Sequence, residues 1–305
     1  MNLLLFLAIF GSFIVYVRCL FSSSWIVRSL AIAYGLWIFI DREASEHGRN
    51  VQGLTQHISK WFFWKYVRSY FDAELIKTAE LDPKKSYIFA CHPHGVYCFS
   101  YFINIFFNMK FYTMFPNIRL FQCTLPVNFY FPFWRDYILS IGTVSSSKKA
   151  IKNALKPGTA MAIFIGGAKE FKHMERNTLD LVLLQRKGFI KIAITTGSSV
   201  VPVLGFGENE LYDQLKHPFF DWMHYLARIG KFACPLFIGN YGILPHRYPL
   251  ITVVGKPLDI IQNDHPSDEE ISRVHQEYMN SLQNLYNAHK DKYHLNRVRE
   301  MKFIN

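Results

Sequence analysis

Four short apolar runs, separated from one another by helical patterns, constrain the fold of this chain more than any other feature. They are Tyr87–Cys91, Ala160–Ile165, Val200–Leu204 and Ile251–Val254, and each is followed by a turn rich in glycine, proline or histidine. Runs that are apolar throughout are typical of parallel strands that are buried on both faces. The alternation of strands and helices therefore predicts an α/β fold, with a mostly parallel sheet flanked by helices.

Three helices are predicted around these strands. One, over residues 145–155, ends before a Pro-Gly pair, and another, over 188–196, ends before Gly197. A third begins at Ser267 with Glu270 three residues later, which is the pattern of a capping box. Its apolar residues are expected on one buried face, namely Ile271, Val274, Tyr278, Leu282 and Leu285.

Residues 1–40 are predicted to form a hydrophobic membrane hairpin, followed by one body over residues 41–305. No charged side chain occurs in residues 1–17, and a second apolar run ends at residue 40. The first run just meets the length of about 20 residues that a bilayer span needs, and the second meets it only if Arg28 snorkels. Arg18 and Arg28 resist translocation, so a re-entrant hairpin and two full spans both stay open. A cleaved signal peptide is disfavoured because no charge precedes the apolar run.

The composition favours some classes of binding partner for residues 41–305 over others. The net charge is +11, aromatic residues reach 17%, and no basic tract or zinc-finger spacing occurs. Basic residues interleaved with aromatic ones favour a membrane surface and a phosphate-bearing ligand over nucleic acid. Residues 60–80 show this pattern most clearly, as an interfacial amphipathic helix would, although a core-packed helix is equally compatible. The five cysteines, an odd number without CxxC spacing, argue against a disulfide framework.

The first predicted strand ends in His92-Pro93-His94-Gly95. Ligands of open α/β sheets bind beyond the carboxyl ends of strands, and an imidazole titrates near pH about 6.5, which suits proton transfer. Pro93 fixes the backbone, and Gly95 permits close approach of another group. A structural turn with capped histidines is the plain alternative. A metal site that uses His173 is another, but no carboxylate cluster completes it, so no metal is predicted.

A glycine pair follows the second strand. Gly166 and Gly167 open the motif GGAKE, and their backbone N–H groups could face a phosphate or the oxyanion of a tetrahedral intermediate. Glu170 in the same motif could orient a catalytic imidazole. A glycine turn with a purely structural role remains open.

Two further positions could bind a polar or charged ligand. Glu208 and Asn209 follow the third strand in a glycine turn, where they could bind a head group or cap the next helix. Arg186 and Lys187 precede the helix over 188–196, where basic residues make a reasonable phosphate site. A solvated basic patch is the alternative for this pair.

In this order, the motifs HPHG, GGAKE, RKGF, VPVLGFGENE and ITVVGKP resemble those of the type 2 diacylglycerol acyltransferase family, which includes monoacylglycerol and wax-alcohol acyltransferases. The resemblance covers roughly residues 41–295. It implies an enzyme of the endoplasmic reticulum membrane and of lipid droplets, with a cytosolic catalytic domain over residues 41–305. It further implies acyl-coenzyme A as co-substrate, no other cofactor, an acylglycerol or fatty alcohol as acceptor, and contact with membrane lipid.

Esterification of diacylglycerol to triacylglycerol is the leading expectation from this resemblance. Monoacylglycerol or a long-chain alcohol as acceptor remains open, and so does a homo-oligomer. A non-catalytic lipid-binding protein of the droplet surface and a metal hydrolase are the alternatives from other classes.

The resemblance also suggests roles for individual residues. Distantly related glycerophospholipid acyltransferases use a His–Asp pair with four residues between its members, and here Tyr97 stands at the acid's place. The orienting acid must therefore come from elsewhere, and Glu170 is the candidate. His92 occupies the place of the base, with His94 close behind it. The expected catalytic residues are His92, His94 and Glu170, and the expected substrate-binding residues are Pro93, Gly95, Gly166, Gly167, Arg186, Lys187, Glu208 and Asn209.

Overall fold

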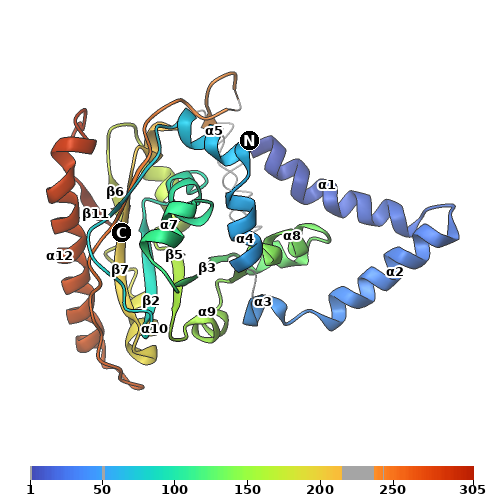
Figure 1. Ribbon diagram of the computed structural model, residues 1–305, viewed down its shortest axis with the longest axis horizontal. Helices are drawn as coiled ribbons and strands as arrows, with labels where there is room; N and C mark the ends of the chain where they lie inside the picture. Colours follow the sequence, from blue (N-terminus) through green and yellow to red (C-terminus); the bar gives the residue numbers. More distant parts are fainter. Residues whose placement is uncertain (1, 50–51, 215–236, 243) are drawn as a thin grey trace.

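The computed structural model describes residues 2–49, 52–214, 237–242 and 244–305, and its centre is a seven-stranded sheet (Figure 1). The strand order is β1-β10-β7-β2-β5-β3-β4. Five neighbouring strands, β7 to β4 in this order, are parallel, whereas β10 is antiparallel to β7 and parallel to β1. The strands are β1 (Glu74–Lys77), β2 (Ser86–His92), β3 (Arg119–Thr124), β4 (Thr143–Ser145), β5 (Thr159–Phe164), β7 (Ser199–Phe206) and β10 (Ile251–Val254).

All four predicted strands are present as β2, β5, β7 and β10, but the expected parallel direction is wrong for β10. Ile251 pairs with Phe206 and Val254 with Val203, so β10 runs against β7. All four β10 residues are buried. An apolar run reports burial on both faces and carries no information on direction, which explains the error.

Helices cover both faces of the sheet. Against one face pack α9 (Lys148–Ala154), α10 (Gly188–Thr196) and α12 (Asp268–Tyr293), and against the other pack α6 (Phe99–Tyr101), the π-helix η1 (Phe102–Phe106) and α7 (Met109–Met114). The strand β2 shows how the pleat separates these two cores. Ile88 and Ala90 face the α12 side, whereas Tyr87, Phe89 and Cys91 face the η1 side.

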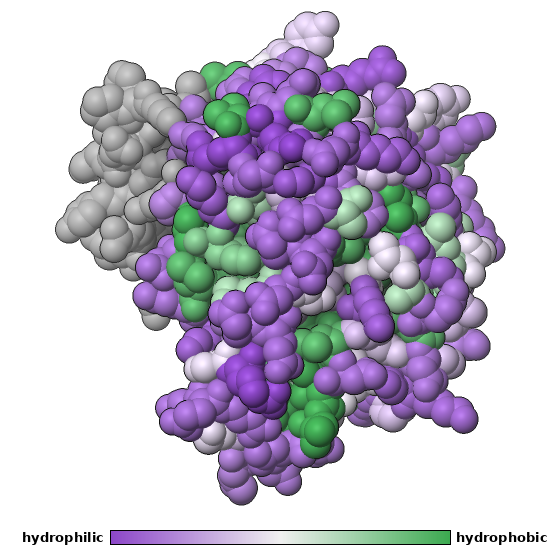
Figure 2. All heavy atoms as spheres, turned by 90° about the vertical axis from the view of Figure 1, so that its left-hand side faces the viewer, coloured by the Kyte–Doolittle hydropathy of each residue, from purple (hydrophilic) through white to green (hydrophobic). Residues whose placement is uncertain are grey.

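The three helices predicted around the strands are confirmed, although the first begins at Lys148 because Ser145 belongs to β4. Gly197, with φ +62°, ends α10, and the Ser267 Oγ accepts a hydrogen bond from the Glu270 N at 3.2 Å at the start of α12. The Glu270 carboxylate accepts instead from the Asn263 amide at 2.7 Å, so only half of the capping box forms. The outward face of α12 is mostly hydrophilic (Figure 2). Its five predicted apolar residues, Ile271, Val274, Tyr278, Leu282 and Leu285, are all buried.

The N-terminal segment forms two helices, α1 (Asn2–Leu20) and α2 (Trp25–Ile40), which project from one side of the body (Figure 1). No helix among the residues that the structure describes is both long and apolar enough to cross a bilayer. The hairpin joins the body where the Tyr34 hydroxyl contacts the Asp136 carboxylate at 2.5 Å and its ring stacks on Phe133 at 4.8 Å. Next to this contact, the buried Arg135 pairs with Asp41 at 2.9 Å.

The segment 60–80 is not one helix. It contains α5 (Phe62–Tyr70), and the chain then enters β1 at Glu74. Cys19, Cys91, Cys98 and Cys123 are free thiols, and Cys234 lies outside the described residues. The other elements are α3 (Ala44–His47), α4 (Gln52–Ser59), α8 (Trp134–Ser140), the 3₁₀ helices η2 (Pro126–Tyr130), η3 (Gly167–His173) and η4 (Glu208–Glu210), the parallel pair β6 (Asp180–Val182) and β11 (Lys302–Ile304), and the antiparallel pair β8 (Asp213–Gln214) and β9 (Phe237–Ile238).

Candidate active site

Three of the predicted turns meet at the carboxyl edge of the sheet. The strand β2 lies between β5 and β7 and is parallel to both, so the turns that follow these strands are neighbours. The turn that carries His92 and His94 therefore lies between the glycine turn after β5 and the turn at Glu208 after β7. The fourth strand end does not take part, because the reversed β10 ends at the opposite edge.

Glu170 stabilises, from one side, the turn that carries His92 and His94, which we call the histidine turn. Its carboxylate is 4% exposed and accepts hydrogen bonds from the backbone N–H of His94 at 2.6 Å and of Val182 at 3.1 Å. Burial raises the pKa of Glu170 to about 7, although these two bonds and Arg186 oppose the shift. A Cβ atom on Gly166 would lie 1.9 Å from the Glu170 Cδ, so only glycine leaves room for the carboxylate.

The described hydrogen bonds of Glu170 go to the backbone rather than to a ring nitrogen. Glu170 therefore holds the turn that carries the imidazole, whereas the sequence suggested an acid that orients the ring itself.

Glu208 holds the same turn from the other side. Its side chain is buried, and its oxygens accept from the backbone N–H of Phe99 at 3.0 Å and of Ser100 at 2.7 Å. It therefore caps the start of α6, which precedes it by about 100 residues, whereas the sequence suggested a cap on the next helix along the chain. A Cβ atom on Gly95 would lie 2.2 Å from the Glu208 Cγ, and burial raises the pKa of Glu208 to about 7. The neighbouring Asn209 donates to the Thr178 carbonyl oxygen at 2.9 Å.

His92 is enclosed beneath α12. Its ring is 2% exposed, and burial lowers its pKa to about 3. Its Nε2 lies 2.9 Å from the hydroxyl oxygen of Tyr278, which also lies 3.4 Å from the Ala90 carbonyl oxygen. The tautomer of the ring decides which of the two atoms donates in the contact between His92 and Tyr278, and the His92 Nδ1 has no partner among the described atoms.

Tyr278 is a contact of this site that the sequence does not reveal. Its place in the apolar pattern of α12 indicates a core residue, and such a pattern cannot show that the hydroxyl has a buried partner.

His94 is half-buried, and its Nδ1 lies 2.8 Å from the Gly95 carbonyl oxygen. Because a carbonyl oxygen only accepts, the proton of the neutral ring is on Nδ1 and the lone pair is on Nε2. Burial lowers the pKa of His94, and the Gly95 carbonyl opposes that shift. The ring lies edge-on to Phe164, with centroids 5.8 Å apart. His94 thus lies on a partly accessible turn that buried carboxyl groups hold in place.

The two basic residues that were expected together at a phosphate site, Arg186 and Lys187, contact different parts of the fold. The Arg186 guanidinium donates to the Gly166 carbonyl oxygen at 3.1 Å, which places it at the glycine turn. The Lys187 ammonium donates to the Ser272 hydroxyl on α12 at 2.8 Å, away from that turn. Within the described residues, no group of three or more His, Cys, Asp or Glu side chains could hold a metal ion.

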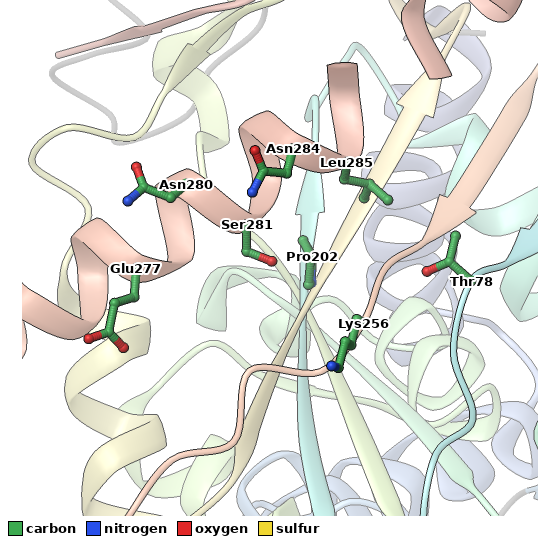
Figure 3. Close-up of a pocket in the computed structure, with 8 residues that line it drawn as sticks. All are labelled: Thr78, Pro202, Lys256, Glu277, Asn280, Ser281, Asn284 and Leu285. Carbon is green, nitrogen blue, oxygen red and sulfur yellow. The ribbon is translucent and has the colours of Figure 1, made fainter. Parts of the chain in front are cut away.

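Two cavities of the body lie apart from the histidine turn. One, of about 410 Å³, lies beside α12 where β10 ends, and the other, of about 630 Å³, lies at the amino edge of the sheet around Arg119 and Thr159. Polar residues of α12 line one side of the first cavity, and Lys256 and Thr78 lie across from the helix (Figure 3). Its lining residues are Thr78, Pro202, Lys256, Glu277, Asn280, Ser281, Asn284 and Leu285.

Comparison with known proteins gives a consistent result. Residues 18–304 match the family model described as diacylglycerol acyltransferase. The chain is 40% identical over 290 residues to diacylglycerol O-acyltransferase 2A of Umbelopsis ramanniana, covering 90% of this chain and 81% of the relative. It is 38% identical over 278 residues to 2-acylglycerol O-acyltransferase 1 of Homo sapiens, covering 87% of this chain and 82% of the relative.

Among solved structures, the chain is similar to PlsC, the 1-acyl-sn-glycerophosphate acyltransferase of Thermotoga maritima. The TM-score is 0.44 at 11% identity, with 94% of this chain and 98% of the other covered.

Proposed function

This chain belongs to the diacylglycerol acyltransferase family and is an acyltransferase, and on that premise we propose that it transfers an acyl group from acyl-coenzyme A to diacylglycerol, giving triacylglycerol. The observation that carries the proposal is the turn at His94, which two buried carboxyl groups hold at the carboxyl edge of the sheet. The relatives named diacylglycerol O-acyltransferase support the acceptor.

His94 is the base in this proposal. Its Nε2 takes the proton of the acceptor hydroxyl while the hydroxyl oxygen attacks the thioester carbonyl carbon. The tetrahedral intermediate then expels the coenzyme A thiolate, which takes the proton from the imidazolium. One C–O bond forms, one C–S bond breaks, and a positioned base typically contributes about 10²–10⁴ in rate.

His92 is less suited to this step than His94. A pKa of about 3 makes its ring a weak base near neutral pH, and α12 encloses it. Its contact with Tyr278 instead ties the end of β2 to α12. The order of the two candidates from the sequence, with His92 first, is therefore reversed in this proposal.

Arg186 is the candidate for an anionic part of the donor. It adjoins the glycine turn at Gly166, next to the fastened histidine turn. A guanidinium suits the phosphate groups of coenzyme A, because it is always charged and can form two parallel hydrogen bonds.

The proposal also includes attachment to the endoplasmic reticulum membrane and to lipid droplets. Large apolar side chains of the hairpin are exposed, among them Trp25, Leu30, Leu36, Phe39 and Ile40. Contiguous exposed apolar surface is a sign of membrane or partner contact. Flotation of the expressed protein with microsomes and droplets tests this part, and recovery in the unbound fraction would argue against it.

Monoacylglycerol is the second candidate acceptor, because relatives at 38% identity are named 2-acylglycerol O-acyltransferase 1. The deciding experiment uses membranes from cells that lack endogenous acyltransferases and express this chain. Labelled acyl-coenzyme A is offered with diacylglycerol, monoacylglycerol or a long-chain alcohol, and triacylglycerol is the expected main product. Binding of acyl-coenzyme A without transfer to any acceptor would indicate a lipid-binding protein instead.

A further inference from the structure

The outward side of α5 and the residue before it are covered by exposed aromatic rings. The exposed fractions are 55% for Trp61, 77% for Phe62, 54% for Phe63 and 69% for Tyr66. These four residues are called the α5 face below. Leaving such rings in water is unfavourable by roughly 25 cal/mol for each Å² of apolar surface, so their clustering on one side points to a partner.

A loop from a distant part of the chain extends this surface. The Tyr70 hydroxyl at the end of α5 donates to the Pro245 carbonyl oxygen at 3.0 Å, which ties to the helix a segment that is described for residues 237–242 and 244–246. In that segment, Tyr241 is 95% exposed and Leu244 is 53% exposed. A segment that is remote in sequence therefore carries exposed apolar side chains close to the C-terminal end of α5.

The charged side chains of residues 48–71, which include α5, are all basic. No Asp or Glu occurs between residues 47 and 71, whereas Lys60 and Lys65 lie among the aromatic residues and are exposed. Aromatic rings interleaved with basic side chains are typical of surfaces that lie at the headgroup level of an anionic bilayer. Interfaces between proteins are depleted of lysine at their centres, which disfavours a second copy as the occupant.

The inward side of α5 packs against the segment that leaves the histidine turn. Trp64 stacks on Phe107 with ring centroids 4.2 Å apart, and the Arg68 guanidinium donates to the Phe107 carbonyl oxygen at 2.9 Å. Phe71 contacts Phe99, and both belong to one cluster with Val96, directly after the turn. A partner surface that binds the outward side of α5 therefore lies close to the histidine turn, where the lipid acceptor is proposed to react.

We propose that the α5 face, together with Tyr241 and Leu244, seats on the surface of an anionic phospholipid bilayer as a membrane contact separate from the N-terminal hairpin. The role of this contact rests on the proposed function, because the contact brings the bilayer surface close to the histidine turn. The contact is interfacial, because the rings lie next to lysines that stay with the headgroups.

The experiment uses the full chain reconstituted in vesicles of phosphatidylcholine and phosphatidylserine. Part of the phosphatidylcholine carries bromine atoms on its acyl chains, either near the headgroup or near the chain end, which quench tryptophan fluorescence. Trp61→Phe keeps an aromatic ring but removes the indole, so the difference between wild type and variant isolates the emission of Trp61.

The matched control is Ile261→Trp in the Trp61→Phe background. Ile261 is 88% exposed and follows the end of β10, whereas α5 adjoins the start of β10 through the hydrogen bond from the Leu250 N to the Phe71 carbonyl oxygen, at 2.9 Å. This control reports a solvent-facing tryptophan at the far end of the same strand.

The expected result is a loss of most of the Trp61 emission with bromine near the headgroup and a smaller loss with bromine near the chain end. The tryptophan introduced by Ile261→Trp keeps its emission in both cases. Substituting Lys60 and Lys65 with glutamine lowers the quenching of Trp61 that depends on phosphatidylserine.

Unquenched Trp61 emission overturns the inference. If Phe62→Cys then cross-links two copies, the face is an interface between copies instead. Esterification in detergent micelles keeps the two proposals distinguishable. Activity with an unquenched Trp61 would leave the proposed function standing, whereas a quenched Trp61 without transfer to any acceptor would support the contact and contradict the function.

Discussion

Gly166→Ala tests whether the contact between Gly166 and Glu170 fastens the histidine turn. Gly166 has φ −64°, which alanine adopts freely, so backbone strain is not introduced. The new methyl group would lie 1.9 Å from the Glu170 Cδ, whereas ordinary contact begins near 3.4 Å. The carboxylate must therefore move by about 1.5 Å.

Such a shift breaks the contacts that hold the turn. The bond from the His94 N–H, now 2.6 Å, would lengthen beyond hydrogen-bond reach, and the bond from Val182 at 3.1 Å would follow. A hydrogen bond to a charged group contributes about 1.5–3 kcal/mol. Misplacing a catalytic group by about 1 Å can cost about 10²-fold in rate. We expect Gly166→Ala to lower kcat by about 10²-fold with diacylglycerol and acyl-coenzyme A.

Two further variants make this test specific. Gly188→Ala is the control, because nothing lies within 4 Å of a Cβ atom there, and it should leave kcat unchanged. Glu170→Ala removes the group that the methyl collides with, so Gly166→Ala should have no additional effect in that background. A wild-type kcat for Gly166→Ala, or additive effects in the double variant, would refute the reasoning.

Three other predictions follow from buried polar groups. Tyr278→Phe leaves the buried His92 Nε2 without its hydrogen-bond partner and should lower the free energy of unfolding by about 1–3 kcal/mol, with little change in kcat. A large loss of kcat at unchanged stability would contradict the assignment of His92. Burial raises the pKa of Glu208 from 4.5 to about 7, so the folded state favours its protonated form. The free energy of unfolding should therefore fall by up to about 3 kcal/mol as the pH rises through that range. Glu208→Gln should flatten this pH dependence, as measured by thermal unfolding. Arg135→Met removes the buried partner of Asp41, which keeps its ion pair with Arg49, and should cost about 1.5–3 kcal/mol in denaturant unfolding. An unchanged midpoint would mean that the joint between hairpin and body does not depend on the pair of Arg135 and Asp41.

Much of the fold could be predicted from the sequence, because burial leaves a strong pattern. Each of the four apolar runs is a strand, and the face of α12 is buried as its periodicity indicates. Direction leaves no such pattern, which is why β10 was assigned as parallel. The three-residue strand β4 was missed because so short a segment cannot show periodicity.

The candidate site was partly predictable for a similar reason. Strand ends that carry His92, Gly166 and Glu208 could be expected to meet, because parallel neighbouring strands end at the same edge. The sequence could not show that Glu170 contacts the backbone of His94 rather than a ring. Nor could it show that the hydroxyl of Tyr278 contacts His92, because such contacts depend on distances that no residue pattern encodes.

The central claim is that the imidazole of His94 takes the proton of the lipid alcohol. The most direct test compares kcat for His94→Ala and His92→Ala with that of the wild type, with His265→Ala, on an exposed loop outside the site, as the control. The account predicts a fall of at least about 10²-fold for His94→Ala, partly restored by added imidazole, and a smaller fall for His92→Ala. Near wild-type turnover by His94→Ala, with abolished turnover by His92→Ala at unchanged stability, would contradict it.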